Sequence, residues 1–210
     1  MKTLTFAFGR FQPPTRGHQL LMVTAQKVAG DGELRIYPSR TQDAKKNPLH
    51  PKQKHHFLRV AFPSMASCFV DDERVRTALD VLTIASDEGF QKAVMVVGSD
   101  RLKTFRTLTA KYNGDLYCLE KIQVVSCGDR DPDADGVEGI SGTQMRKAAV
   151  EADFNAFLLG LPDAMSIAHA RDLFTAVANG LAKKIPKVPK PQGSRPLVLT
   201  PHHPPPSALP

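Results

Sequence analysis

Ten residues near the amino terminus combine the residue types that hold a phosphate group. A short apolar run ends in Gly9, Arg10 follows it, and His18 lies where a helical pattern begins. Glycine at the end of a strand lets the backbone approach a ligand closely, and the first N–H groups of a helix attract an anion. Thr15 can cap the helix or face the same ligand, and Arg16 adds positive charge. These features predict a phosphate-binding loop.

The same loop argues against two common nucleotide-binding classes. It matches neither the GxxxxGK[ST] pattern of P-loop hydrolases nor the GxGxxG pattern of classical dinucleotide-binding proteins. The sequence therefore gives little support to either class of nucleotide-binding protein. The alternative is a purely structural role for His18 as a residue at the start of the helix.

A second cluster lies in residues 140–146, ISGTQMR. Ser141 and Thr143 are favourable cap residues whose hydroxyls, together with nearby N–H groups, can hold phosphate oxygens. Arg146 projects one turn along the predicted helix and can clamp a polyphosphate. Read in isolation, the segment is also an ordinary helix cap, so its function depends on what lies beside it.

Two further loops follow predicted strands and carry polar residues. Gly98 and Asp100 end one strand in a turn, where a carboxylate can accept hydrogen bonds from a ribose or a base. Lys45, Lys46 and Asn47 lie in a polar loop after the second strand. Read by residue type alone, two lysines in such a loop are compatible with simple solvation.

The elements that must position these residues alternate along the chain up to about residue 182. Short apolar or β-branched runs predict strands at 3–8, 33–37, 67–70, 92–97 and 121–126, and longer periods predict helices near 17–29, 51–61, 73–88, 101–112, 143–151, 153–159 and 163–182. We therefore expect an α/β fold, a Rossmann-like doubly wound parallel sheet of about five strands with C-terminal helices. Ligands bind such sheets outside the carboxyl ends of the strands, where these loops lie.

The domain organisation follows from composition. Residues 1–182 form one predicted domain, and residues 183–210 form a basic, proline-rich tail in which nine of the last 25 residues are Pro. Proline cannot donate a backbone hydrogen bond, so we expect this tail to be disordered or semi-rigid. The tail either has no function of its own or docks onto a larger assembly. The acidic run 129–139 is expected to form a mobile loop over the site.

Charge and cysteine content limit the partners and the compartment. The net charge is +7, of which the tail supplies five, so the body is nearly neutral and nucleic acid is not the expected partner. No stretch approaches the length of a membrane helix, and three scattered cysteines fit neither a disulfide scaffold nor a zinc site. We expect a cytoplasmic protein without a metal cage; the sequence is compatible with a homo-oligomer.

The first loop, GRFQPPTRGH, resembles the GxFxPx[H/T]xxH signature of the HIGH superfamily of nucleotidyltransferases, which includes nicotinamide mononucleotide adenylyltransferases, pantetheine-phosphate adenylyltransferases and cytidylyltransferases. ISGTQMR resembles the second signature of that superfamily, ISxTxxR, and VVGSDR resembles its GxD element. The loop around Lys45 is similar to the NPF-type loop of archaeal-like nicotinamide mononucleotide adenylyltransferases. Thr15 stands where the common HxGH version has His, and Gly142 stands where ISSTxxR has Ser; a mechanism that needs two histidines is therefore in doubt.

The resemblance implies a part for each predicted site residue. His18, with the backbone near Phe11, would contact the reacting α-phosphate, and Thr15 would support the loop. Arg10 and Arg146 would hold the pyrophosphate part. The remaining nucleotide-binding residues would be Gly9, Gly17, Gly98, Asp100, Ser141 and Thr143, and the acceptor-binding residues Lys45, Lys46 and Asn47. Mg²⁺ would arrive with the triphosphate, because this ion keeps several waters and needs few protein ligands.

The activity implied is transfer of a nucleoside monophosphate from ATP to a phosphorylated acceptor, with nicotinamide mononucleotide as the favoured acceptor, NAD as the product and pyrophosphate released. Cytidylyl transfer from CTP is the nearest alternative. The stretch SGTQMRKAAVEADFNAFLLGLP also resembles phage-encoded, cytidylyltransferase-like members of the superfamily. A phage protein would act in the host cytoplasm, or it would be a non-catalytic virion protein that keeps the fold.

Overall fold

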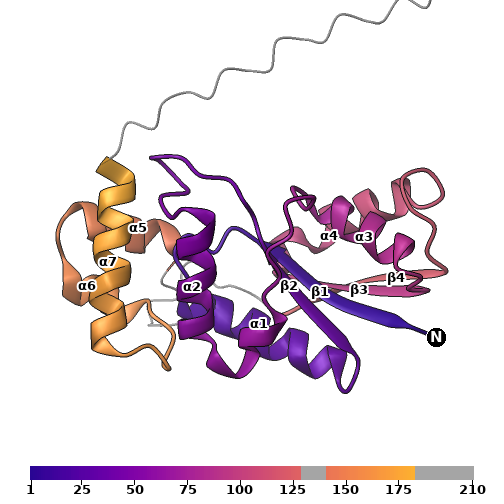
Figure 1. The fold of residues 1–210 in the computed structure, drawn as a ribbon, viewed down its shortest axis with the longest axis horizontal. Helices are drawn as coiled ribbons and strands as arrows, with labels where there is room; N and C mark the ends of the chain where they lie inside the picture. Colours follow the sequence, from indigo (N-terminus) through magenta and orange to yellow (C-terminus); the bar gives the residue numbers. More distant parts are fainter. Residues whose placement is uncertain (129–140, 183–210) are drawn as a thin grey trace, which may run out of the picture.

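The computed structural model describes residues 1–128 and 141–182 (Figure 1). The expected acidic loop at 129–139 and the proline-rich tail at 183–210 lie outside these residues. The elements, in chain order, are β1 (Thr3–Gly9), α1 (Arg16–Ala29), β2 (Glu33–Pro38), α2 (Pro51–Ala61), a 3-10 helix η1 (Pro63–Cys68), α3 (Ala78–Asp87), β3 (Lys92–Val97), α4 (Ser99–Lys111), β4 (Lys121–Ser126), α5 (Gly142–Val150), α6 (Phe154–Leu159) and α7 (Ile167–Ala182).

The sheet is parallel, and its described strands lie in the order β2-β1-β3-β4. β1 pairs with β2 on one side, with Leu4 opposite Glu33, and with β3 on the other, with Thr3 opposite Lys92. The chain thus winds outward from β1 to β2 and then returns to the far side of β1. The strand order reverses between β1 and β3, and a doubly wound sheet binds ligands at the carboxyl ends of the strands at such a point.

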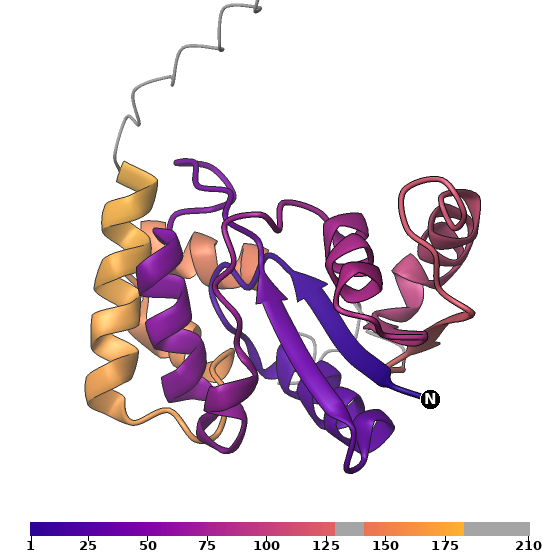
Figure 2. The same ribbon diagram turned by 45° about the vertical axis from the view of Figure 1, so that its right-hand side comes forward.

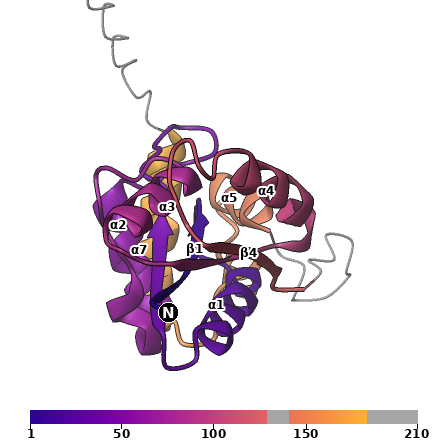
Figure 3. The same cartoon turned by 90° about the vertical axis from the view of Figure 1, so that its right-hand side faces the viewer.

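Helices cover both faces of the sheet, as expected for a doubly wound fold. Leu4 and Phe6 point from β1 into a core with α3, whereas Ala7 packs with Met22 of α1 on the other face. Figure 3, viewed from one end of the molecule, shows α1 on one side of the sheet and α3 and α4 on the other. Strand residues must be apolar on both faces here, which explains the nearly continuous apolar runs in the sequence.

The C-terminal helices form a third core at one end of the sheet. Met145 of α5, Phe157 of α6 and Leu173 of α7 are fully buried together with Leu49, which lies in the segment between β2 and α2. Figure 2 shows α7 beside α2, with the arrowheads of β1 and β2 pointing toward α5. This core therefore holds the second signature against the carboxyl ends of the strands.

The predicted strand at 67–70 is wrong. Pro63 begins the 3-10 helix that runs to Cys68, and only Phe69 then bridges to Ile36 beside β2. Two acidic residues follow at 71 and 72, so the chain leaves the sheet after a single pairing. The described sheet therefore has four strands rather than about five.

The start of one helix also differs from the prediction. The helix expected from residue 73 begins only at Ala78, after a turn in which Arg74 pairs with Asp72. Thr77 caps the helix, and the Asp80 carboxylate accepts hydrogen bonds from the backbone N–H groups of Arg76 and Thr77. The capping box thus fixes the helix start five residues later. No helix in the described residues is both long and apolar enough to cross a membrane.

Candidate functional site

The first-signature loop closes on itself through Thr15 and His18. Thr15 is the N-cap of α1, and its backbone N–H donates a hydrogen bond to Nδ1 of His18 at 3.0 Å. The Thr15 hydroxyl lies 2.9 Å from the same nitrogen. Because Nδ1 accepts from a backbone N–H, neutral His18 carries its proton on Nε2. The loop therefore fixes which imidazole nitrogen is the donor.

Phe11 holds the His18 ring in place from the other side. The two ring centroids lie 4.8 Å apart in an edge-on arrangement, and Phe11 is 1% exposed. The Phe11 backbone has φ of 48°, a left-handed conformation that costs energy for a side chain of this size. A Cβ atom on Gly9 would lie 2.9 Å from the Phe11 ring, so glycine is needed for this close approach. Gly9 and Phe11 thus shape the loop together.

The second signature meets the first through Arg146. Ser141 caps α5, accepting a hydrogen bond from the backbone N–H of Gln144, as its residue type predicts. Arg146 Nη1 donates to the backbone carbonyl of Gln12 at 2.7 Å, and its Nη2 donates to Thr143 Oγ1 at 3.0 Å. Two segments more than 120 residues apart in sequence therefore form one polar surface.

Positive charge accumulates at this junction. Burial lowers the pKa of Arg146, and the nearby charge of Arg10 lowers it further, whereas Asp43 raises it. Arg10 is exposed at the end of β1. An anion between the two guanidinium groups would relieve their mutual repulsion.

Arg16 does not add to that charge as expected. Its Nη2 lies 2.5 Å from an Asp163 carboxylate oxygen, in the segment between α6 and α7. Its backbone N–H donates to the carbonyl of Gly160. Arg16 therefore anchors the start of α1 to the C-terminal helices, while Gly17 occupies the second position of the first turn.

The loop expected to bind the acceptor, residues 39–49 (the acceptor loop), folds around Asp43. One Asp43 oxygen accepts the backbone N–H groups of Lys45 and Lys46 at 2.8 and 2.6 Å. Hydrogen bonds from the backbone, the Lys46 N–H above all, lower the pKa of Asp43 to about 2. Asn47 is 5% exposed and donates its amide to the other Asp43 oxygen. The turn presents both lysine side chains to solvent and buries Asn47.

The third predicted element lies apart from these contacts. Gly98 precedes α4 as its N-cap, and the Asp100 side chain is 69% exposed. Asp100 lies 3.5 Å from the Arg101 guanidinium. Within residues 1–128 and 141–182, no hydrogen bond or ion pair joins Asp100 to either signature. Gly98 and Asp100 lie at the carboxyl end of β3, at the same edge of the sheet as the first-signature loop.

Gln12 was missed by sequence reasoning. Its side chain is 3% exposed and bonds to the backbone of Leu49 in both directions, at 3.0 Å from Nε2 and 2.9 Å to Oε1. Its carbonyl is the acceptor for Arg146. One feature of the sequence could have indicated this role. Gln12 is a polar residue between Phe11 and two prolines, where its side-chain amide can form hydrogen bonds to a second loop.

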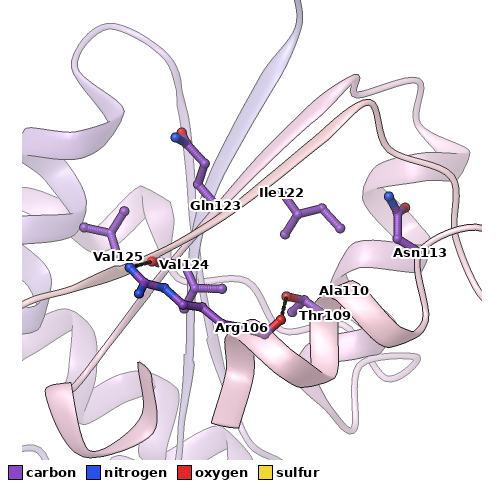
Figure 4. A pocket seen from close by; sticks show the side chains of 8 residues that line it. All are labelled: Arg106, Thr109, Ala110, Asn113, Ile122, Gln123, Val124 and Val125. Atoms are coloured by element: carbon purple, nitrogen blue, oxygen red, sulfur yellow. Dashed lines mark hydrogen bonds between the residues drawn. The ribbon is translucent and has the colours of Figure 1, made fainter. Parts of the chain in front are cut away.

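A surface hollow lies elsewhere. Figure 4 shows its lining between α4 and the edge strand β4. Its volume is about 610 Å³. Arg106 and Asn113 of α4 and Gln123 of β4 line it, and none of the predicted site residues does. In the part of the chain that is described, no three His, Cys, Asp or Glu side chains gather as a metal site would need. The predicted site residues thus lie outside this hollow.

Comparisons with known proteins bear on the fold. A structure described as a nicotinate-nucleotide adenylyltransferase from Vibrio parahaemolyticus is 15% identical, with a TM-score of 0.54 over 82% of this chain and 99% of that one. Plasmodium falciparum nicotinic acid mononucleotide adenylyltransferase gives 14% identity and TM-scores of 0.54 with APC bound and 0.53 with NaAD bound, over 83% of this chain and 98% and 95% of those chains. No protein-family model and no curated protein sequence matches the chain. The chain has the fold of these nucleotidyltransferases.

Proposed function

We propose that this protein transfers the adenylyl group of ATP to the phosphate of a pyridine mononucleotide, with nicotinamide mononucleotide as the favoured acceptor. An acceptor phosphate oxygen attacks the α-phosphorus, the bond from that phosphorus to the β-phosphate bridging oxygen breaks, and pyrophosphate leaves. The observation that carries the proposal is the hydrogen bond from Arg146 to Gln12, because it joins two polyphosphate-binding segments.

His18 is the residue we assign to the reacting phosphate. Its Nδ1 is occupied by the Thr15 backbone N–H, so Nε2–H is the donor toward a non-bridging oxygen of the α-phosphate. Negative charge develops on these oxygens in the transition state, and a preorganised donor stabilises it. A phosphate monoester is already anionic at neutral pH, so the reaction needs no general base.

Arg10 and Arg146 are assigned to the departing pyrophosphate. Both are cations at the same end of the sheet, and the Arg146 fork is already oriented by Thr143 and by the Gln12 carbonyl. Ser141 lies at the start of α5, where N–H groups favour an anion. Mg²⁺ enters as part of the triphosphate substrate.

Lys45 and Lys46 are assigned to the acceptor, and Asn47, which is buried and bonded to Asp43, is assigned to the turn that carries them. The turn that presents the two lysines lies close enough to Arg146 for Asp43 to affect the pKa of that arginine. This proximity supports an acceptor phosphate that lies beside the polyphosphate. Catalysis in this arrangement comes from positioning and charge neutralisation.

Pyrophosphate release by the purified full-length protein tests the proposal. ATP and CTP are supplied separately with Mg²⁺, each with nicotinamide mononucleotide, nicotinic acid mononucleotide and a panel of phosphorylated alcohols. We expect release with ATP and a pyridine mononucleotide. Release only with CTP would identify a cytidylyltransferase, and nucleotide binding without release in any pair would indicate a non-catalytic protein with this fold.

A further inference from the structure

Two buried polar side chains hold the ends of the acceptor loop. Lys54 of α2 contacts its first residue, Ser39, and Gln12 contacts its last residue, Leu49. Neither side chain belongs to the set assigned to substrate. Both are almost completely buried, Lys54 at 0% and Gln12 at 3% exposure.

Burial of the Lys54 ammonium group costs free energy of desolvation. Its ammonium donates a hydrogen bond to the Ser39 carbonyl, and the Ser39 backbone N–H donates in turn to the carbonyl of Gly9 at 2.8 Å. Burial, reinforced by the charge of Arg40, lowers the pKa of Lys54 to about 8. An apolar side chain at this position would fill the space without the desolvation penalty. The ammonium therefore has a specific task, which is to fix Ser39 against the first-signature loop.

Gln12 fixes the other end and connects it to the second signature. Its amide pairs with both backbone groups of Leu49, so the loop cannot shift without breaking two buried hydrogen bonds. The Gln12 carbonyl receives Arg146. The same residue thus sets the distance between the acceptor loop and the arginine assigned to pyrophosphate.

We propose that Gln12 and Lys54 are positioning residues that clamp the two ends of the acceptor loop and thereby set the affinity for the acceptor. The inference rests on the proposed function, in which Lys45 and Lys46 bind that acceptor. Asp43 builds the turn at the centre of the loop by itself. Loss of a clamp therefore leaves the turn intact but displaces it from the polyphosphate.

Substitution of each clamp by methionine separates positioning from folding. Gln12→Met and Lys54→Met keep side-chain volume and remove the hydrogen bonds. We expect the KM for nicotinamide mononucleotide to rise about 10-fold, as for loss of one or two buried hydrogen bonds, while the KM for ATP stays within about 2-fold. Gln19→Met and Lys103→Met are matched controls: Gln19 contacts Asp163, and Lys103 is exposed on α4. Both controls should match the parent.

Two outcomes overturn the inference. One is an unchanged acceptor KM in both clamp variants; the other is an equal rise in both KM values together with a lower thermal unfolding midpoint, which indicates general damage. If the parent shows no turnover with any substrate pair, the proposed function fails. Amide hydrogen exchange then tests whether Gln12 and Lys54 fix the ends of the loop. The amides of Ser39 and Leu49, which hold the two ends of the loop in the parent, should exchange faster in the clamp variants than in the controls, and unchanged exchange would refute the clamp.

Discussion

The junction of the two signatures and the acceptor turn differ in how their charges are held. At the junction, Arg146 is half-buried and bonded to both signatures, and His18 is fixed by Thr15. In the turn, Lys45 and Lys46 are exposed, and within the described residues only their backbones are fixed. Rigid donors suit a transition state of defined geometry, whereas flexible cations suit a phosphate that must arrive and leave. Substitutions at the junction should therefore lower kcat, and those in the turn should raise KM.

The largest effect is expected at His18. His18→Ala removes the donor assigned to the α-phosphate, so kcat should fall by roughly 100-fold to 1,000-fold, as for loss of one transition-state donor. Steady-state kinetics with both substrates measures it, and circular dichroism checks that α1 is retained. Unchanged turnover in a folded variant would remove His18 from the reaction.

The next effect concerns stability at the Lys54 clamp. The pKa of Lys54 is about 8 when folded against an ordinary 10.5, so the unfolded chain binds more protons between these values. The free energy of unfolding should therefore gain up to about 3 kcal/mol from this residue as pH rises through that window. Chemical unfolding of the parent and of Lys54→Met from pH 7 to 10.5 measures the difference. Parallel pH profiles for the two proteins would show that folding does not lower the pKa of Lys54.

Arg146→Lys tests the difference between junction and turn, because it keeps the positive charge and removes the planar guanidinium group. An ammonium cannot contact the Gln12 carbonyl and the Thr143 hydroxyl in the same geometry. We expect kcat to fall about 10-fold or more, with the acceptor KM little changed. A variant with parental kcat would show that only the charge at this position matters.

The acceptor turn should give the smallest change in kcat. Lys45→Gln and Lys46→Gln each remove one exposed cation while the Asp43 turn persists, so we expect the KM for the mononucleotide to rise several-fold with kcat nearly constant. Raising the salt concentration should weaken acceptor binding in the parent more than in either variant. A fall in kcat without a change in KM would reverse the distinction between turn and junction.

The sequence predicted much of this arrangement because the relevant signals are local. Gly9, Thr15 and Ser141 stand at the ends of strands and helices, where residue type reflects backbone geometry directly. The strand at 67–70 failed because four apolar or small residues cannot show whether a neighbouring strand is available. Pro63 and the acidic pair at 71–72 limit that segment to one bridge.

Contacts between distant segments were not predictable from single residue types. Arg16 was expected to add charge for the ligand, but it pairs with Asp163, and nothing near it in sequence indicates this partner. Gln12 and Lys54 are buried polar residues whose partners are backbone atoms of another loop. Backbone partners leave no sequence pattern, so only the fold reveals them.

The central claim is that both signatures form one adenylyl-transfer site. The most direct measurement is chromatographic quantification of the dinucleotide and the pyrophosphate formed from ATP, Mg²⁺ and limiting nicotinamide mononucleotide. The account predicts one dinucleotide for each pyrophosphate in the parent, and loss of both together in His18→Ala. Pyrophosphate without dinucleotide, or neither product from a protein that binds both substrates, would contradict it.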